Sequence, residues 1–154
     1  MNKKLLSAIA FLMLISFNTI VAQSQSLTKT PSVTYSSNLD TPLNSNETKM
    51  LKEVYADKLD EYILSKPNRL LSVKNILRNR VAIIELPAEK LKGLKNLSEV
   101  PLFNHYNSKL KRDTTVDKNN FNPLKYEFDF YSRRASFIRI DNTNSVIHIK
   151  SQMQ

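Results

Sequence analysis

The sequence contains no cysteine and no tryptophan, and it has one glycine and two histidines among 154 residues. Without cysteine the chain forms no disulfide, iron–sulfur cluster, thiolate nucleophile or zinc ribbon. A single glycine excludes the Gly-rich phosphate loops and dinucleotide-binding fingerprints, which need two or three. The chain is too short for an α/β barrel of about 250 residues, so we expect one domain at most.

The first 22 residues have the three-part pattern of a secretory signal peptide. Lys3 and Lys4 form a basic head, an apolar stretch runs over 5–21, and small or polar residues follow. We place cleavage between Ala22 and Gln23, within about two residues. The alternative is an uncleaved membrane anchor. It fits less well because the stretch contains serine, asparagine and threonine and is shorter than the roughly 20 apolar residues of a spanning helix.

The chain that remains after this cleavage is basic and compact enough to fold. Removing 22 of the 154 residues leaves 132, and removing two of the 23 basic residues leaves 21 against 14 acidic ones, a net charge of +7. A chain of this size buries about two-thirds of its unfolded surface, which suffices for a thiol-free core. Lack of cysteine is more typical of a bacterial exported protein than of a small eukaryotic secreted one. We expect it to be periplasmic or secreted, with no later membrane span.

A polar leader precedes the predicted domain. Residues 23–44 are rich in Ser, Thr, Gln, Asn and Pro and show no apolar period, so we predict a disordered leader. Apolar residues at helical spacing then predict two helices, over 47–64 and 69–78. Asn44 or Ser45 is expected to cap the first of them. The domain is therefore placed over 45–154.

The second half of the domain has the periodicity of strands. The β-branched run 81–86 predicts a buried strand, and 88–123 predicts short turns and loops. Apolar and polar residues alternate over 124–131, 136–140 and 145–150, with turn residues between them. We therefore predict an α+β fold, in which a C-terminal antiparallel meander and strand 81–86 form a sheet covered on one face by the two helices.

The alternation also predicts a register for the meander. A turn at 132–134 pairs Tyr131 with Ala135 and Phe128 with Ile138. The apolar face then collects Tyr126, Phe128, Phe130, Ile138, Ile140, Ile147 and Ile149. The polar face collects Lys125, Glu127, Asp129, Arg139, His148 and Lys150. A slip by one residue would place Arg139 among the aromatic side chains, so the apolar face selects this register.

Two carboxylates on the predicted polar face are weak catalytic candidates. Glu127 and Asp129 are two residues apart, which places their carboxylates about 6–7 Å from each other on a strand. Paired carboxylates at such spacing serve glycoside hydrolysis. The simpler interpretation, which we favour, is a solvated strand face on which Glu127 pairs with Arg139.

The histidines add a second candidate. In the predicted register His148 lies across Phe137 from Asp129, and a carboxylate beside an imidazole is the basis of a general base. His105 would have to join them to form a zinc site, and no spacing fixes that separation. The alternative, which we favour, is that both histidines are partly exposed structural residues.

Basic residues suggest a third kind of site. The predicted anion-binding side chains are Arg78, Arg80, Lys109, Lys111, Arg112, Arg133 and Arg134. A positive balance attracts polyanions through counterion release. The sequence shows no interleaving of aromatic and basic residues of the kind that binds single strands. Solvated charge, with lysine stems covering the core, is the alternative.

Three C-terminal segments carry a resemblance. They read LSEVPLFNHYNSKLKRD, FNPLKYEFDFYSR and RIDNTNSVIHIKSQ, and with the Ala-Gln pair at the end of the signal segment they resemble a family of small exported proteins from flavobacteria-type organisms. The resemblance covers residues 97–154. It implies an exported domain, and because the family has no assigned activity it supplies no catalytic residues.

Together these observations favour a non-enzymatic exported domain that binds or supports an envelope or secreted component. We predict no cofactor. The partner would be an envelope protein or an anionic polymer. Two alternatives stay open: a polyanion-binding protein for lipopolysaccharide, anionic lipid or DNA, and a small hydrolase that uses Asp129 and His148.

Overall fold

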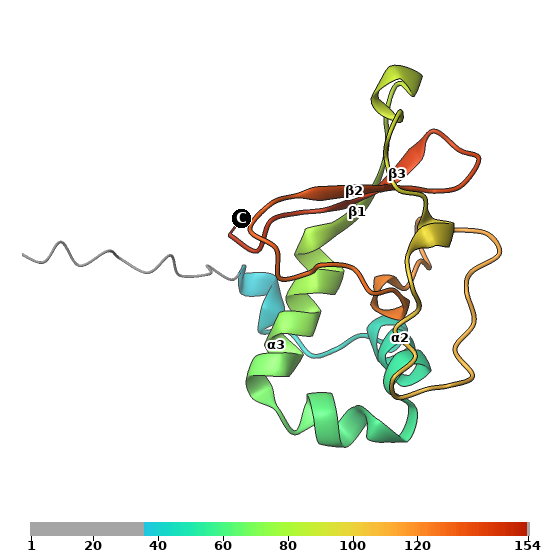
Figure 1. The fold of residues 1–154 in the computed structure, drawn as a ribbon. Coiled ribbons are helices and arrows are strands. Elements are labelled where there is room, and N and C mark those ends of the chain that lie inside the picture. Colours follow the sequence, from blue (N-terminus) through green and yellow to red (C-terminus); the bar gives the residue numbers. More distant parts are fainter. Residues whose placement is uncertain (1–35, 154) are drawn as a thin grey trace, which may run out of the picture. The chain divides into compact units, whose positions relative to one another are not determined.

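The computed structural model describes residues 36–153 (Figure 1). The predicted signal peptide and the leader up to residue 35 lie outside the described residues. Helices precede strands along the chain: α2 (Ser45–Tyr55), α3 (Pro67–Asn75), β1 (Val81–Glu85), β2 (Ser136–Arg139) and β3 (Ser145–Ile149). The predicted α+β class is confirmed, with two helices and an antiparallel sheet.

The sheet has the strand order β1-β3-β2, so the last strand of the chain is the central one. Ile147 lies opposite Ile83 on one side and Ile138 on the other. The β2–β3 hairpin is the one predicted from the sequence, and Asn142 takes a left-handed conformation in its turn, with φ of 57°. The Thr143 hydroxyl donates to the Ile140 carbonyl at 2.8 Å and closes that turn.

The core lies between one face of this sheet and the helices (Figure 1). Ile147 and Ile149 of β3 are fully buried there. The helices contribute Leu51, Val54, Val73 and Ile76 to the same cluster. Burial of each such side chain stabilises the fold by about 1.5–3 kcal/mol. The packing of the helices on this sheet face is therefore the main apolar contribution to stability.

The first predicted helix is interrupted. Its cap is confirmed: Glu47 N–H donates to the Asn44 side chain at 2.8 Å, and Asn44 N–H donates back to the Glu47 carboxylate at 2.9 Å. The helix ends at Tyr55 because Ala56 has φ 48° and ψ −125°. A short 3-10 turn and a π-helical turn (Asp60–Leu64) follow, and they bury Ile63 in the core.

The second helical segment begins earlier than predicted. Pro67 does not merely end the preceding helix; it occupies the first turn of α3, where its missing N–H costs nothing. The segment continues beyond Asn75 as a π-helical turn (Ile76–Arg80), which leads directly into β1. The strand predicted over 81–86 is confirmed as Val81–Glu85.

The predicted strand over 124–131 is wrong. This segment starts with a 3-10 turn (Pro123–Lys125), and Glu127 N–H then donates to the Pro101 carbonyl at 3.0 Å instead of to β2. Local bonds between residues two apart follow, from Phe128 N–H to Tyr126 O and from Phe130 N–H to Phe128 O. These γ-turn bonds use groups that a ladder would need, so Ile138 pairs with Ile147 and not with Phe128.

The N-terminal segment 36–44 was assigned to the disordered leader, but the structure places it against the helices. Leu39 is 1% exposed. The Lys74 ammonium donates to the carbonyls of Leu39 and Thr41 at 3.0 and 2.7 Å, and Arg78 donates to the Pro42 carbonyl at 2.8 Å. Sequence composition missed this segment because the charged partners that bind its carbonyls lie more than 30 residues away.

Replacement of Ala56 by glycine tests the interruption of the first helix. A non-glycine residue at φ 48° and ψ −125° is strained, and Ala56→Gly is expected to raise the free energy of unfolding by about 1 kcal/mol. Urea denaturation measures the change. The control, Ala88→Gly, lies in a 3-10 turn without positive φ and is expected to lower it by about 0.5 kcal/mol. If both variants lower the free energy of unfolding equally, the strained backbone conformation assigned to Ala56 is wrong.

Replacement of Arg78 by methionine tests the ion pair with Glu47. The Arg78 side chain is 12% exposed, and the Glu47 side chain is 8% exposed. Leaving Glu47 buried without its partner is expected to cost about 3 kcal/mol at pH 7. The control is Lys58→Met, which breaks the exposed Lys58–Glu61 pair and is expected to cost less than about 1 kcal/mol.

The pH dependence of this loss gives a second readout. The hydrogen bond from Arg78 is the main cause that lowers the pKa of Glu47 below 4.5, so the pair stabilises the fold above that pH and ceases to do so as the pH falls through the lowered pKa. Urea denaturation measures the free energy of unfolding of the wild type and of Arg78→Met. The difference between these two free energies is therefore expected to shrink as the pH falls from 5 to about 2. A difference that stays constant over that range would contradict the pair.

Candidate functional site

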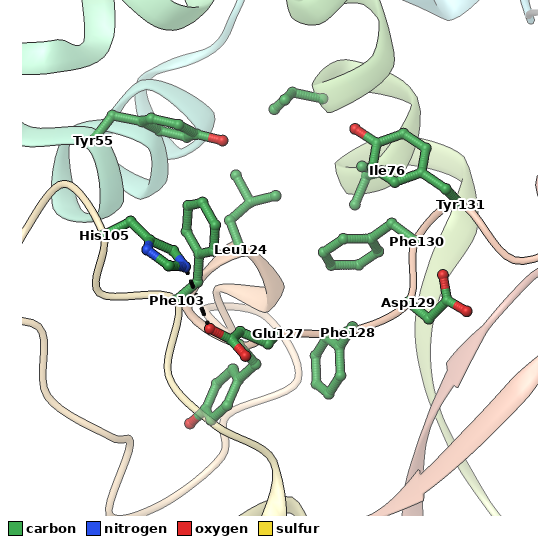
Figure 2. A pocket seen from close by; sticks show the side chains of 12 residues that line it. Tyr55, Ile76, Phe103, His105, Leu124, Glu127, Phe128, Asp129, Phe130 and Tyr131 are labelled. Carbon is green, nitrogen blue, oxygen red and sulfur yellow. Dashed lines mark ion pairs between the residues drawn. The ribbon is translucent and has the colours of Figure 1, made fainter.

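An aromatic cavity of about 460 Å³ opens beside segment 124–131. Six aromatic rings line it: Tyr55, Phe103, Tyr126, Phe128, Phe130 and Tyr131. Val73 and Ile76 from the α3 segment and Leu124 complete the apolar wall. Figure 2 shows Tyr55 on one side of the cavity and Tyr131 on the other, with Phe103 and Phe130 between them.

A second cavity adjoins the first. Its volume is also about 460 Å³, and it shares Tyr55, Val73, Phe103 and Tyr131 with the first cavity. Tyr106 belongs to this second wall, and its ring centroid lies 5.2 Å from that of Tyr55 and 5.8 Å from that of Phe103. The two cavities therefore form one continuous surface of aromatic faces and edges, which we call the aromatic cleft.

The start of segment 124–131 is anchored by a buried polar network. The Lys125 ammonium contacts Asp113 at 2.5 Å and Glu53 at 3.2 Å, and its side chain is 5% exposed. The Tyr126 hydroxyl donates to the same Asp113 at 2.9 Å. Asn122 donates to the Met50 carbonyl at 2.9 Å and so ties the segment to α2. These contacts hold the start of the segment in place, and the aromatic side chains that follow in the sequence line the cleft.

Burial sets the protonation states of this region. Burial alone lowers the pKa of Lys125, but the hydrogen bonds with Asp113 and Glu53 outweigh it and leave that pKa above 10.5. Burial raises the pKa of Tyr55 and of Tyr126 to about 12. Tyr55 and Tyr126 are therefore neutral phenols, and Lys125, at the start of segment 124–131, is charged and paired.

The formal charges at the aromatic cavity are negative. Glu127 and Asp129 line it, and both are exposed. His105 Nε2 lies 3.5 Å from Glu127 Oε1, with side chains that are 64% and 42% exposed (Figure 2). Lysine and arginine are absent from its twelve lining residues. The cavity thus combines apolar walls with carboxylates at its rim.

The structure brings together only part of the predicted catalytic set. Glu127 and Asp129 both line the cavity, one on each side of Phe128 (Figure 2). His148 does not join them. It follows Ile147, which faces the core, so it lies on the other face of β3, stacked on Phe137 with ring centroids 4.5 Å apart. The predicted polar face with Asp129 and His148 is therefore wrong, because 124–131 is not a strand of the sheet.

The alternative partner predicted for Glu127 is also corrected. Arg139 donates to the Thr143 carbonyl at 3.1 Å inside its own hairpin, and Glu127 contacts His105 instead. His105 was considered in the sequence only as a zinc ligand. Among residues 36–153 no group of three or more His, Asp or Glu side chains is placed to hold a metal ion. The one sequence feature that could have indicated His105 is its position between the aromatic residues Phe103 and Tyr106.

The seven predicted anion-binding side chains divide into two groups. Arg78, Arg80 and Arg112 serve the fold: Arg80 donates to the Lys150 carbonyl at 2.9 Å, and Arg112 donates to the carbonyls of Leu97 and Val100. The exposed group is Lys109, Lys111, Arg133 and Arg134. These four lie in two separate loops, so the basic surface is smaller than the sequence suggests.

Comparison with protein-family models, with curated proteins and with solved structures gave no match. The resemblance of residues 97–154 to small exported proteins therefore stays an expectation from the sequence. Among the described residues, no helix is both long enough and apolar enough to cross a bilayer.

Proposed function

We propose that this chain is an exported, non-enzymatic binding domain whose ligand site is the aromatic cleft. One observation carries the proposal: six aromatic side chains surround a cavity of about 460 Å³, within the range of small-molecule sites. Tyr131 is exposed and Tyr55, Phe103 and Phe128 are half-buried, so these four rings retain apolar surface, and a ligand that covers them gains the free energy of its burial.

Tyr131 is the clearest element of this surface. It is 64% exposed, more than any other large apolar side chain among the described residues. It lines both cavities of the cleft, so its ring borders the whole site. An exposed aromatic side chain contributes little to the core, and exposure of this kind beside a cavity is typical of a contact residue.

The polar groups support binding over catalysis. Asp129 lines the aromatic cavity and His148 does not. The pair that does meet, His105 with Glu127, has no serine or threonine among the residues that line this cavity, and Ser72 lines only the adjoining one. A hydrolase of the serine type needs a hydroxyl nucleophile beside its base. The export part of the proposal is supported by the signal-peptide pattern of residues 1–22.

Export has its own test. The chain recovered from outside the cytoplasm is expected to have the mass of a polypeptide that begins at Gln23, within about two residues, because cleavage follows the small residue Ala22. Intact-mass spectrometry measures this. A full-length chain found only in the cytosol would contradict export and leave the cleft to be tested separately.

Replacement of Tyr131 by alanine tests the cleft as the ligand site. The probe is 2-phenylethanol, a neutral aromatic compound, followed by amide shifts in ¹⁵N–¹H spectra. Loss of the exposed ring is expected to weaken the binding of 2-phenylethanol by about tenfold. Contacts between aromatic rings supply about 0.5–1.5 kcal/mol in addition to the free energy of burying their apolar surface. The free energy of unfolding is expected to change by less than about 0.5 kcal/mol.

The control for this variant is Phe137→Ala. Phe137 is also exposed, at 36%, but lies on the sheet face away from the core. Its loss is expected to leave the dissociation constant of 2-phenylethanol unchanged. Equal weakening by both variants, or no amide shift around the cleft in the wild type, would overturn the proposed site.

A further inference from the structure

We infer that the aromatic cavity recognises a small organic cation, an ammonium group carried on an apolar or aromatic body. This inference rests on the proposed function and names the ligand class of the same site. Three features of the cavity support it: the charge of its lining residues, a carboxylate without a hydrogen bond or ion pair among the described residues, and the attraction of aromatic ring faces for cations.

The first argument is charge complementarity. The whole chain carries a formal net charge of +9, so a surface without basic side chains is unusual for this molecule. The twelve lining residues include Glu127 and Asp129 and neither lysine nor arginine. The charged side chains that line this cavity are therefore opposite in sign to the net charge of the chain, and they favour a positively charged ligand there.

The second argument is that these carboxylates are available. Within residues 36–153 the Asp129 carboxylate takes part in no hydrogen bond or ion pair. Glu127 has one contact, with His105 at 3.5 Å, and both side chains are exposed. By contrast, Glu47 and Asp113 are committed to Arg78 and Lys125. Those at the cavity can accept hydrogen bonds from an ammonium group.

The third argument is the chemistry of the rings. The face of an aromatic ring attracts a cation, with the strongest effect where water is excluded. The domain already uses its rings in this way at two places: the Arg69 guanidinium lies 5.9 Å from the Tyr62 centroid, and that of Arg112 lies 5.5 Å from the Tyr126 centroid. The first cavity of the cleft combines aromatic rings with Glu127 and Asp129, and its lining includes no lysine or arginine, whereas Arg69 lines the adjoining cavity.

An anion is disfavoured by the same geometry, because it would face two carboxylates. A neutral aromatic compound gains the apolar contact with the rings but not the electrostatic attraction of a cation to the carboxylates. The ligand class therefore predicts an order of affinity within one carbon skeleton. Cation, neutral compound and anion should bind in that order.

The experiment titrates the purified protein with three compounds of nearly equal size, at pH 7.5 and 50 mM salt. They are 2-phenylethylammonium, 2-phenylethanol and 3-phenylpropanoate. The ammonium compound is expected to bind about tenfold more tightly than the alcohol, and the carboxylate more weakly than both. Raising the salt to 500 mM is expected to reduce the advantage of the cation and to leave the alcohol unaffected.

Charge-removing variants locate the effect. Asp129→Asn and Glu127→Gln together are expected to bring the dissociation constant of 2-phenylethylammonium to within about twofold of the alcohol's. The alcohol itself should bind as it does to the wild type. The matched control is Glu89→Gln, which removes an exposed carboxylate outside the cleft and is expected to leave the cation's advantage intact.

The outcomes separate this inference from the proposed function. Equal binding of the alcohol and the cation, with both still dependent on Tyr131, would overturn the cation preference and keep the cleft. A cation preference that survives both carboxylate variants would also overturn it. If none of the three compounds shifts the amides around the cleft, the proposed function itself fails.

Discussion

The ion pair between Glu47 and Arg78 is the contact on which the geometry of the domain depends. One carboxylate closes the capping box of α2 and accepts two hydrogen bonds from Arg78, at 2.6 and 2.7 Å. The same guanidinium donates to Asn38, Thr41 and Pro42 in the N-terminal segment. A single charged pair therefore joins α2, the turn after α3 and segment 36–44. Because both charges are nearly buried, neither can be removed alone without leaving the other uncompensated.

The cavity follows from this arrangement and from a second buried network. The ion pair sets α2 against the α3 segment, which places Tyr55 and Val73 on two walls of the cleft. The Lys125 network sets the remaining wall, because it fixes the root of segment 124–131 between Asp113 and α2. Tyr126 and Phe130 of this segment belong to the core, while its γ-turns leave Phe128 half-buried and Tyr131 exposed beside the cavity.

Sequence reasoning succeeded where a signal is local and failed where the decisive partner is distant. The Asn44 cap, the strand beginning at Val81 and the β2–β3 hairpin each depend on neighbouring residues, and all three are confirmed. The alternation of residues 126–131 predicted their burial correctly, since Tyr126 and Phe130 are buried and Glu127 and Asp129 exposed. It could not show that the backbone groups bond to residues two positions away and to Pro101. Periodicity reports which side chains are buried, and hydrogen-bond partners decide whether a segment joins a sheet.

The same distinction explains the candidate site. Glu127 and Asp129 both line the cavity, but the partners predicted for them depended on the register of a strand that does not form. Nuclear Overhauser effects between bound 2-phenylethylammonium and the protein test the central claim most directly, because they identify the side chains that touch the ligand. The account predicts contacts to the rings of Phe103 and Tyr131, on the shared walls of the cleft. Contacts to Phe137, an exposed side chain on the sheet face away from the core, with none to the cleft, would contradict it.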